Sequence, residues 1–307
     1  MLSANFPSRI KIVEVGPRDG LQNESIPIPT PIKVGFVNAL ARAGLSEVEV
    51  TSFVHPKWVP QLADAAEVLE AIERDAAVVY SALVPNEKGM ERALLAGLDR
   101  ISVFTAASES FNKKNINASI AESIERFKPV LSMARDSGIG VRGYVSTAFW
   151  CPYEGKIEPK AVTNVVEQLF DLGIEEISIG DTIGAAVPTE VNRLIDVLEE
   201  RGSLENIAMH FHDTRGTALP NVLASLGRGI SIYDSSAGGL GGCPYAPGAS
   251  GNLATEDLVY FLDGLGLETG VDLEKVSRAS DEIEHALGHA LPSRVRKAGP
   301  FRPTPLP

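Results

Sequence analysis

Eight short apolar runs, separated by stretches with helical periodicity, are the feature that most constrains the fold of this chain. The runs recur about every 30 residues, which is the length of one strand and the helix that follows it. Eight such units predict an α/β fold, a TIM (β/α)8 barrel. The predicted strands are Ile10–Val15, Glu47–Ser52, Ala77–Leu83, Arg100–Thr105, Gly140–Ser146, Glu176–Gly180, Ala208–His212 and Ile230–Asp234.

The stretches between these runs have ordinary amphipathic helical patterns, and a glycine that can end a helix follows several of them. A Gly-rich stretch, Ala237–Asn252, follows the last predicted strand. A doubly wound sheet is the alternative architecture, but no GxGxxG follows the first strand, where a dinucleotide fold would need it. The helical patterns are Pro31–Ala43, Ala161–Leu172, Pro188–Glu200, Leu253–Leu265 and Leu273–Leu291.

The length of 307 residues suits a single α/β barrel. No linker of domain-separating composition interrupts the chain, so we predict one domain over residues 1–307. Its barrel covers about 8–236, and a lid and a short C-terminal helical extension cover about 237–298.

Net charge and cysteine content exclude several classes of protein. A net charge of −12 argues against a partner made of nucleic acid, because duplex-binding proteins usually carry a basic face. The two cysteines are not in a CxxC pair and are too few for a disulfide framework, which favours the cytoplasm. The chain shows neither a signal core at residues 1–9 nor an apolar run long enough for a bilayer, so we expect no membrane partner.

The pattern His210-x-His212, at the end of the seventh predicted strand, is the sharpest local signal. Residues i and i+2 of a strand point to the same side, so both imidazoles can reach one metal at the barrel mouth. Asp19 and the side-chain oxygen of Asn252 are the best complements to the two histidines. Imidazole suits Mn, Co, Ni or Zn, and carboxylate and amide oxygens suit Mg or Mn, so the residues do not select one ion.

Arg18 stands beside Asp19 after the first strand, in a turn bounded by glycines. An arginine there can polarise a carbonyl oxygen and stabilise an enolate. Glu49, at the end of the second strand, is flanked by apolar residues. Because a buried carboxylate needs a partner, we expect Glu49 to pair with Arg18.

Cys243 lies in the Gly-rich sequence GGLGGCPY at 238–245. The glycines permit movement, so this segment reads as a lid that carries a thiol able to act as a general acid. Cys151 lacks such glycines, and we expect it only to pack. Lys113 and Lys114, after the fourth strand, either meet phosphates or form a solvated loop. His285 and His289 are four residues apart on the predicted last helix, where we expect a structural role.

Several long stretches resemble the 3-hydroxy-3-methylglutaryl-CoA (HMG-CoA) lyase family, within the DRE-TIM metallolyase superfamily. The resemblance covers nearly the whole chain, from about Ile10 to His289. The superfamily shares Arg and Asp on the first strand, Glu on the second and HxH on the seventh. The matching stretches are VGPRDGLQNE at 15–24, TSFVHPKWVP at 51–60, KKNIN at 113–117, CPYEGK at 151–156, GLGGCPY at 239–245 and GASGNLATED at 248–257.

The resemblance implies cleavage of HMG-CoA to acetyl-CoA and acetoacetate, in the setting of leucine degradation and ketone bodies, with Mg²⁺ or Mn²⁺ as cofactor. It also implies a small CoA thioester as substrate and a homo-oligomer, either a dimer or a tetramer. The implied metal ligands are Asp19, His210, His212 and Asn252. The implied catalytic residues are Arg18, Asp19, Glu49, Asp181, Cys243 and Glu256. The implied substrate contacts are Arg18, Gln22, Lys113, Lys114 and Thr214.

This chain departs from the family pattern at two places beside the expected pocket. Phe149-Trp150 stand where the family has a pair of small residues, and Arg215 follows the HxHDT sequence where the family has Tyr. These departures leave open a lyase for a related thioester, such as a citramalyl-CoA or a longer 3-hydroxyglutaryl-CoA analogue. A condensing synthase of the isopropylmalate type is less favoured, because such enzymes usually carry a long C-terminal regulatory domain. A catalytically silent metal-binding protein is a third alternative.

Overall fold

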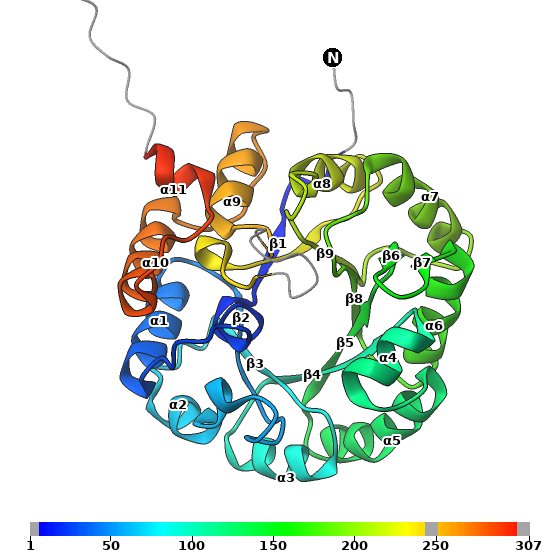
Figure 1. The fold of residues 1–307 in the computed structure, drawn as a ribbon, viewed down its shortest axis with the longest axis horizontal. Helices are drawn as coiled ribbons and strands as arrows, with labels where there is room; N and C mark the ends of the chain where they lie inside the picture. Colours follow the sequence, from blue (N-terminus) through cyan, green and yellow to red (C-terminus); the bar gives the residue numbers. More distant parts are fainter. Residues whose placement is uncertain (1–5, 243–250, 300–307) are drawn as a thin grey trace, which may run out of the picture.

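The computed structural model describes residues 6–242 and 251–299. Its barrel strands are β1 (Lys11–Glu14), β2 (Glu47–Ser52), β3 (Val79–Leu83), β4 (Arg100–Ala106), β5 (Gly140–Ser146), β8 (Glu176–Asp181), β9 (Ile207–Phe211) and β10 (Ile232–Ser235). These eight strands form a closed parallel barrel in the order β1-β10-β9-β8-β5-β4-β3-β2 (Figure 1). The predicted TIM barrel is therefore confirmed, and the ends of the predicted strands are displaced by at most two residues.

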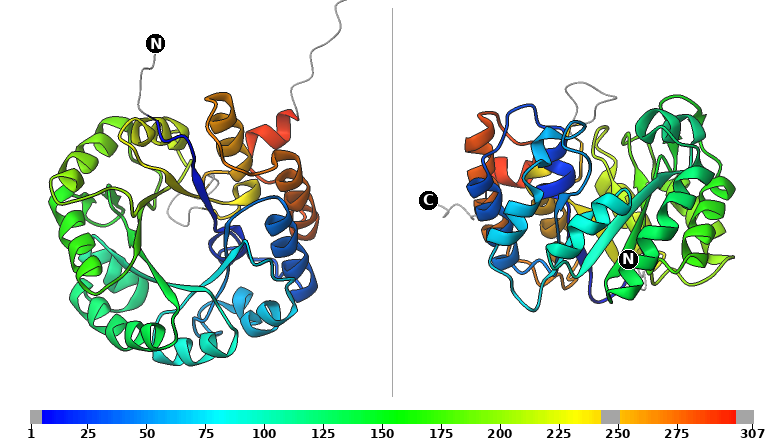
Figure 2. Two further views of the ribbon diagram at one scale, coloured as in Figure 1. Left: turned by 180° about the vertical axis from the view of Figure 1, so that it is seen from behind. Right: turned by 90° about the horizontal axis from the view of Figure 1, so that it is seen from below.

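Helices surround the strands on the outside, as Figure 2 shows from behind and from below. They are α1 (Thr30–Arg42), α2 (Ala65–Ala71), α3 (Glu87–Leu95), α4 (Glu109–Ile116), α5 (Ile120–Asp136), α6 (Pro159–Asp171), α7 (Pro188–Glu199), α8 (Ala218–Leu226), α9 (Thr255–Gly264), α10 (Leu273–Leu287) and α11 (Arg294–Ala298). The C-terminal helices α9 and α10 fill the sector of the ring between α8 and α1 (Figure 1). The helical extension thus helps to complete the wall of the barrel.

One predicted helix ends earlier than its apolar pattern suggested. The prediction continued to Leu291, but α10 ends at Leu287 because Gly288 adopts a left-handed conformation with φ of 69°. Glycine takes this conformation without the steric penalty of a Cβ atom, so it ends the helix. His285 therefore lies on α10, whereas His289 lies outside it, and the predicted helical pair is wrong.

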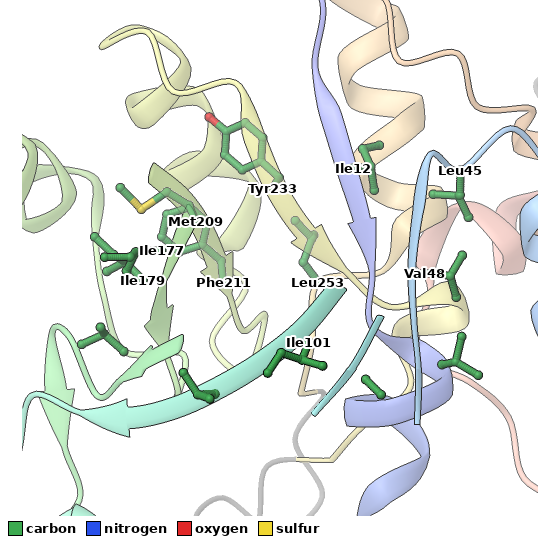
Figure 3. Packing of buried hydrophobic residues seen from close by; sticks show 14 of the residues in the cluster. Ile12, Leu45, Val48, Ile101, Ile177, Ile179, Met209, Phe211, Tyr233 and Leu253 are labelled. Carbon is green, nitrogen blue, oxygen red and sulfur yellow. The ribbon is translucent and has the colours of Figure 1, made fainter. Parts of the chain in front are cut away.

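The hydrophobic core lies between the outer face of the barrel and the helices. Successive side chains of a strand point to opposite faces, so every second residue meets the helical layer. Figure 3 shows Ile12, Val48, Ile101, Met209 and Tyr233 within this cluster, each from a different strand. All five are buried. The residues on the outward face of each strand therefore form the main apolar core together with the helices.

The inner face of the barrel is unusually polar. TIM barrels usually fill this space with branched aliphatic side chains. Here an apolar cluster of Val13, Val15, Ala208 and Ile232 accompanies many ionised groups. Charged side chains in ion pairs across the interior are Lys11, Glu47, Glu49, Arg100, Arg142, Glu176 and Asp234. A network of ion pairs thus extends through the interior, from the start of the strands to their C-terminal ends.

Shorter elements decorate the strand ends. A π-helical turn, η1 (Gly16–Gly20), follows β1, and 3₁₀ turns occur at η2 (Pro60–Leu62) and η3 (Ala237–Gly239). A small antiparallel hairpin, β6 (Trp150–Cys151) and β7 (Gly155–Lys156), follows β5. In the part of the chain that the structure describes, no helix combines the length and apolar character needed to span a bilayer.

Candidate metal centre and active site

The turn η1 carries two of the predicted site residues, Arg18 and Asp19. The backbone N–H groups of Arg18, Asp19 and Gly20 all point at the carbonyl oxygen of Val15, at 3.2, 2.7 and 3.1 Å. Pro17 suits the start of this turn because it has no N–H to satisfy. Single π-helical turns are rare and often occur at functional sites. The sequence analysis had interpreted this segment as an irregular turn.

Asp19 lies beside two histidines, His210 on β9 and His212 directly after it. Asp19, His210 and His212 each offer a ligand atom, and these atoms lie within 4.8 Å of one another. The two imidazole centroids are 5.2 Å apart. Asn252 joins this group, since it forms a β-bridge with His212 and its Nδ2 donates to Asp19 Oδ2 at 2.9 Å. The four predicted ligands thus come together from both ends of the chain.

Two buried polar atoms of this cluster have no partner within the described residues. They are Asn252 Oδ1 and His212 Nδ1. A buried polar atom without a partner is costly, and a bound cation would satisfy such atoms. Ligand atoms about 2.1 Å from one octahedral cation lie about 3.0 to 4.2 Å from each other, and those of Asp19, His210 and His212 lie within 4.8 Å of one another. The four residues therefore fit a divalent cation.

The pKa values of the cluster suit this assignment. Burial and the nearby His210 lower the pKa of His212 to about 3, so its imidazole is neutral at physiological pH and can ligate. For Asp19, burial favours the neutral acid, but the positive charge of Arg18, the nearby His210 and the hydrogen bond from Asn252 together outweigh burial. The pKa of Asp19 therefore falls to about 2, and its carboxylate is ionised. Neutral imidazole and carboxylate are the forms that bind metals.

Asp234 orients His210 from the interior of the barrel. His210 Nδ1 and Asp234 Oδ2 are 3.2 Å apart. The carboxylate can only accept, so Nδ1 carries a proton, and in the neutral imidazole Nε2 is then the nitrogen with the free lone pair. Burial disfavours the imidazolium, but the hydrogen bond and charge of Asp234 raise the pKa of His210 overall. Carboxylate partners of this kind commonly fix ligating histidines.

The expected pairing of Arg18 with Glu49 is confirmed. Arg18 Nε donates to Glu49 Oε2 at 2.5 Å, and Arg18 Nη1 donates to Asp19 Oδ1 at 2.6 Å. Glu49 also accepts hydrogen bonds from Ser102 and from Tyr144, the latter at 3.2 Å. Arg18 is 6% exposed, so its guanidinium is held next to the metal cluster by buried partners.

Two predicted acidic residues bind backbone groups and are not among the clustered ligands. Asp181, at the end of β8, accepts from the N–H groups of Ala185 and Ala186 at 3.0 and 3.1 Å. Burial raises its pKa to about 6. Glu256, on α9, accepts from the N–H of Gly238 at 2.8 and 3.0 Å and from Ser280 at 2.6 Å. Both carboxylates thus position loops near the site.

The predicted substrate contacts lie around the strand ends. Gln22 is partly exposed just beyond η1, and Lys113 and Lys114 are exposed on α4. Lys114 Nζ lies 3.8 Å from the ring centroid of Tyr153. The hydroxyl of Thr214 is buried and has no hydrogen-bond partner among the described residues. Cys243, the predicted thiol acid, lies outside the described residues.

The two departures from the family pattern point away from the metal cluster. Phe149 is buried with its ring centroid 6.4 Å from that of Phe211. Trp150 Nε1 donates to Glu190 on α7 at 3.1 Å. Arg215 donates to the carbonyl groups of Ile183 and Gly184, at 2.7 and 3.0 Å. These side chains pack the walls and loops around the site.

The sequence analysis missed the interior side chains that support the site. Arg142 and Tyr144 lie on β5, and Asp234 lies on β10. The one sequence signal for these interior residues is Arg142 itself, because a charged side chain is unusual within an apolar strand. Tyr144, two residues later, lies on the same inward face of β5. The sequence analysis also assigned no role to Glu14, a polar residue at the end of the first strand, although Glu14 Oε1 accepts from backbone N–H groups of both η1 and η3.

Comparisons with known proteins agree with this geometry. The HMGL-like family model matches residues 9–283. The mitochondrial hydroxymethylglutaryl-CoA lyase of Bos taurus is 53% identical over 95% of this chain and 90% of its own length. The crystal structure of the Bacillus subtilis HMG-CoA lyase has a TM-score of 0.94 at 50% identity, covering 95% of this chain and 98% of the other.

A second similar solved structure contains two bound ligands. It is an HMG-CoA lyase from Acinetobacter baumannii in complex with coenzyme A and 3-methylmalate. Its TM-score is 0.91 at 39% identity, and the match covers 97% of this chain and 98% of that protein. Because the family model matches most of the chain and the Bos taurus relative shares 53% of its aligned residues, this chain belongs to the HMGL-like family.

Proposed function

We propose that this protein is a divalent-metal-dependent carbon–carbon lyase that cleaves HMG-CoA to acetyl-CoA and acetoacetate. The observation that carries this proposal is the cluster of Asp19, His210 and His212 with Arg18 directly beside it. The sequence relatives named HMG-CoA lyase support the substrate. The solved relative with bound coenzyme A supports a CoA thioester.

Asp19, His210, His212 and Asn252 would hold the metal ion. A bound divalent cation supplies Lewis acidity and lowers the pKa of a nearby hydroxyl group. Mg²⁺ and Mn²⁺ are the ions that a mixed set of carboxylate, amide and imidazole ligands accommodates best within this family, and Mn²⁺ tolerates the imidazoles better.

Asp19, or a base next to it, takes the proton from the C3 hydroxyl in this proposal. Its pKa of about 2 makes the carboxylate a weak base, so it accepts a proton only from a hydroxyl that has itself been acidified. Asn252 Nδ2 and Arg18 Nη1 hold one oxygen each, at 2.9 and 2.6 Å. The carboxylate is therefore fixed in place before substrate arrives.

Arg18 stabilises the charge that develops as the bond between C2 and C3 breaks. The electron pair of that bond moves to the acetyl-CoA fragment as an enolate, while C3 becomes the ketone carbon of acetoacetate. A buried guanidinium placed at the thioester oxygen stabilises an enolate far better than water does. Glu49 holds Arg18 at 2.5 Å and keeps its orientation.

Cys243 completes the reaction in this proposal by giving the thiol proton to the C2 carbanion. The role comes from its place in the Gly-rich sequence before Pro244. A thiol is a suitable general acid toward carbon, because its ordinary pKa of about 8.5 lies between those of a carboxylic acid and an alcohol.

A substrate panel tests the proposed function. Chelator-treated protein, reconstituted with Mg²⁺ or Mn²⁺, is assayed with HMG-CoA, a citramalyl-CoA and a longer 3-hydroxyglutaryl-CoA analogue. We expect the highest kcat/KM with HMG-CoA and no turnover without metal. A preference for another thioester would assign the related lyase activity, and no cleavage of any would refute the proposal.

The Arg18→Met variant tests the role of the guanidinium. We expect kcat to fall at least about 100-fold with little change in KM, because the enolate charge exists only after bond cleavage begins. Arg228→Met is the control, since that side chain pairs on the surface with Asp196 and Glu199. Near-normal turnover by Arg18→Met would remove Arg18 from the mechanism.

A further inference from the structure

Arg142 occupies the middle of the barrel interior and reaches three other side chains at once. It is 1% exposed. Its Nε donates to Glu176 at 2.6 Å, its Nη1 donates to the hydroxyl of Tyr144 at 2.8 Å, and its Nη2 donates to Asp234 at 2.5 Å. The mechanism proposed above gives this residue no role, and it is not among the clustered metal ligands.

One arm of Arg142 leads to the histidine side of the metal cluster. Asp234 Oδ1 accepts from Arg142, while Asp234 Oδ2 accepts from Ser178 at 2.7 Å and faces His210 Nδ1 at 3.2 Å. The two oxygens are thus divided between Arg142 and His210. Arg142 therefore fixes the rotation of the carboxylate, and the carboxylate fixes the imidazole.

The other arm leads to the arginine that faces the substrate. Tyr144 accepts from Arg142, and its single hydroxyl proton is donated to Glu49 Oε2 at 3.2 Å. Glu49 in turn holds Arg18. The guanidinium carbons of Arg18 and Arg142 lie over the Tyr144 ring, at 5.3 and 5.0 Å from its centroid. Because a tyrosine has only one O–H, the bond from Arg142 directs it toward Glu49.

We propose that Arg142 is a positioning residue that couples the two halves of the catalytic centre, the metal ligand His210 and the enolate-stabilising Arg18. The inference rests on the proposed function, since it assigns Arg142 a part in that reaction. The fork geometry of a guanidinium is essential here. A lysine ammonium is a single point and cannot serve three acceptors that lie in different directions from a planar group.

Arg100 on the neighbouring strand β4 is a matched control. It also points into the barrel, and its Nη1 lies 3.0 Å from Glu47 and 3.5 Å from Glu176. Among the described residues its ion-pair partners are Glu47, Glu175 and Glu176, which lie at the start of their strands. Arg100 therefore shares the ionic network of Arg142 but not its two arms.

The experiment compares Arg142→Lys and Arg100→Lys with the wild-type protein. Mn²⁺ is titrated into each chelator-treated protein by calorimetry, and kcat and KM for HMG-CoA are then measured at saturating Mn²⁺. For Arg142→Lys we expect a loss of about 10- to 100-fold in Mn²⁺ affinity. We also expect kcat to fall at least about 10-fold, with KM within about threefold of the wild-type value. For Arg100→Lys we expect Mn²⁺ affinity and kcat within about twofold of wild type, whatever the change in Tm.

Two results would overturn the inference. One is wild-type Mn²⁺ affinity and kcat in Arg142→Lys. The other is an equal loss in Arg100→Lys, which would make the effect a general one of the interior charges. If Arg142→Lys does not fold, Tyr144→Phe breaks the arm from Arg142 to Glu49 without removing a charge. A fall in kcat for Tyr144→Phe supports the inference, and an unchanged kcat overturns it. A wild-type protein that binds Mn²⁺ but does not cleave HMG-CoA would refute the proposed function separately, while the Mn²⁺ titrations still test Arg142.

Discussion

The hydrogen-bond partners that a side chain of this site has, and those that it lacks, indicate what it can bind. Asn252 is an example of both. Its Nδ2 donates to Asp19 Oδ2 at 2.9 Å and to the carbonyl of Leu240 at 3.0 Å, whereas its Oδ1 is buried without a partner among the described residues. The amide can therefore face a carboxylate and a cation at the same time, which neither an ionised carboxylate nor a hydrocarbon can do.

Asn252→Asp should make the stability of the protein depend more strongly on metal. Without metal, the new carboxylate faces Asp19 and the Leu240 carbonyl with no proton to donate. We expect a loss of about 2 kcal/mol, which lowers Tm by roughly 4 °C. Added Mn²⁺ should restore more Tm in this variant than it adds to the wild type, because a cation neutralises the paired carboxylates. Differential scanning fluorimetry with and without Mn²⁺ measures both effects.

Asn221→Asp is the matched control for this prediction. Asn221 is fully buried on α8, its Nδ2 donates to the carbonyl of Ala186 at 2.9 Å, and its Oδ1 also has no partner among the described residues. This variant should lose a similar amount of stability, but Mn²⁺ should not restore it. An equal response to Mn²⁺ in Asn252→Asp and the wild type would contradict the prediction.

Glu14 should make the protein less stable as the pH rises. Burial raises the pKa of Glu14 from 4.5 to about 8, against the lowering effect of hydrogen bonds from Thr255, Ala237 and Gly16. The folded protein then keeps a proton that the unfolded chain releases near pH 4.5. The folded state binds more protons between these values, so the free energy of unfolding falls as pH rises through this window.

The Glu14→Gln variant isolates this contribution. Glutamine resembles the protonated acid in shape but does not titrate, so the free energy of unfolding should fall less between about pH 5 and 8. Urea denaturation at a series of pH values gives the two slopes. Identical slopes in the variant and the wild type would show that Glu14 is ionised in the folded protein.

The residues proposed to bind the metal were easier to predict than those behind them. Asp19 and the pair His210 and His212 stand at strand ends, where the local pattern alone places them at the barrel mouth. The supporting role of Arg142 and Asp234 depends on their contact with each other, although they are 92 residues apart in the chain. No local pattern encodes such a contact, so the supporting layer emerged only from the three-dimensional arrangement.

At the scale of elements, a close contact between two glycines lies directly beside the Asn252 side chain. Gly241 has φ of 100°, and a Cβ atom there would lie 2.6 Å from Asn252 Nδ2. Gly251 is also pressed against Gly241, since its Cβ would lie 1.6 Å from the Gly241 carbonyl oxygen. The two ends of the Gly-rich segment thus approach each other as bare backbone.

Gly241→Ala should therefore weaken metal binding. The added methyl group pushes the Asn252 side chain away from Asp19, and the positive φ adds strain of about 1 kcal/mol or more. We expect at least about a 10-fold loss of Mn²⁺ affinity by calorimetry. Gly242→Ala is the control, because a Cβ there meets nothing within 4 Å among the described residues. Its affinity should stay within about twofold of wild type, and equal losses in both variants would contradict the prediction.

The elements with strong periodicity were predicted well, and those shaped by tertiary contacts were not. The eight barrel strands each carry apolar side chains on the face that meets the helices, so their positions could be predicted from the sequence. The π-helical turn η1 depends on three N–H groups that share the Val15 carbonyl, and the hairpin of β6 and β7 has only two residues in each strand. Such short elements carry too little periodicity to be predicted from sequence.

At the scale of the whole molecule, the C-terminal segment after α10 supports the mouth of the barrel. A Cβ at Gly238 would lie 2.3 Å from Leu291 Cδ1, so Leu291 packs directly on η3. Ser293 N donates to the Gly238 carbonyl at 3.0 Å, and Ser293 Oγ donates to Asp257 at 2.8 Å. The segment 291–293 thus connects α11 to the turn that begins the Gly-rich stretch.

Leu291→Ala should reduce both stability and activity. Deleting a buried leucine side chain costs about 2–5 kcal/mol. The cavity forms under Gly238, so kcat for HMG-CoA should also fall, by about 10-fold. Leu69→Ala, at a buried position on α2, is the control and should lower Tm alone. Thermal unfolding and steady-state kinetics at 10 °C below the lower Tm separate the effects, and unchanged kcat in Leu291→Ala would contradict the prediction.

Three expectations at this scale stay predictions. They are the division into one domain over residues 1–307, the cytoplasmic location and the homo-oligomer of two or four subunits. Light scattering on the purified protein measures the last directly. A monomer at micromolar concentration would contradict it.

The hydrogen bond between Asp19 and Asn252 joins residues separated by 233 positions. On a ribosome that adds about 5–20 residues per second, Asp19 emerges tens of seconds before its amide partner is made. Until β10 (Ile232–Ser235) is made, β1 lacks one of its two neighbours and the ring of strands cannot close. The proposed metal ligands are therefore complete only late in biogenesis, and a nascent chain stalled before residue 232 should neither retain Mn²⁺ nor form the closed ring of strands.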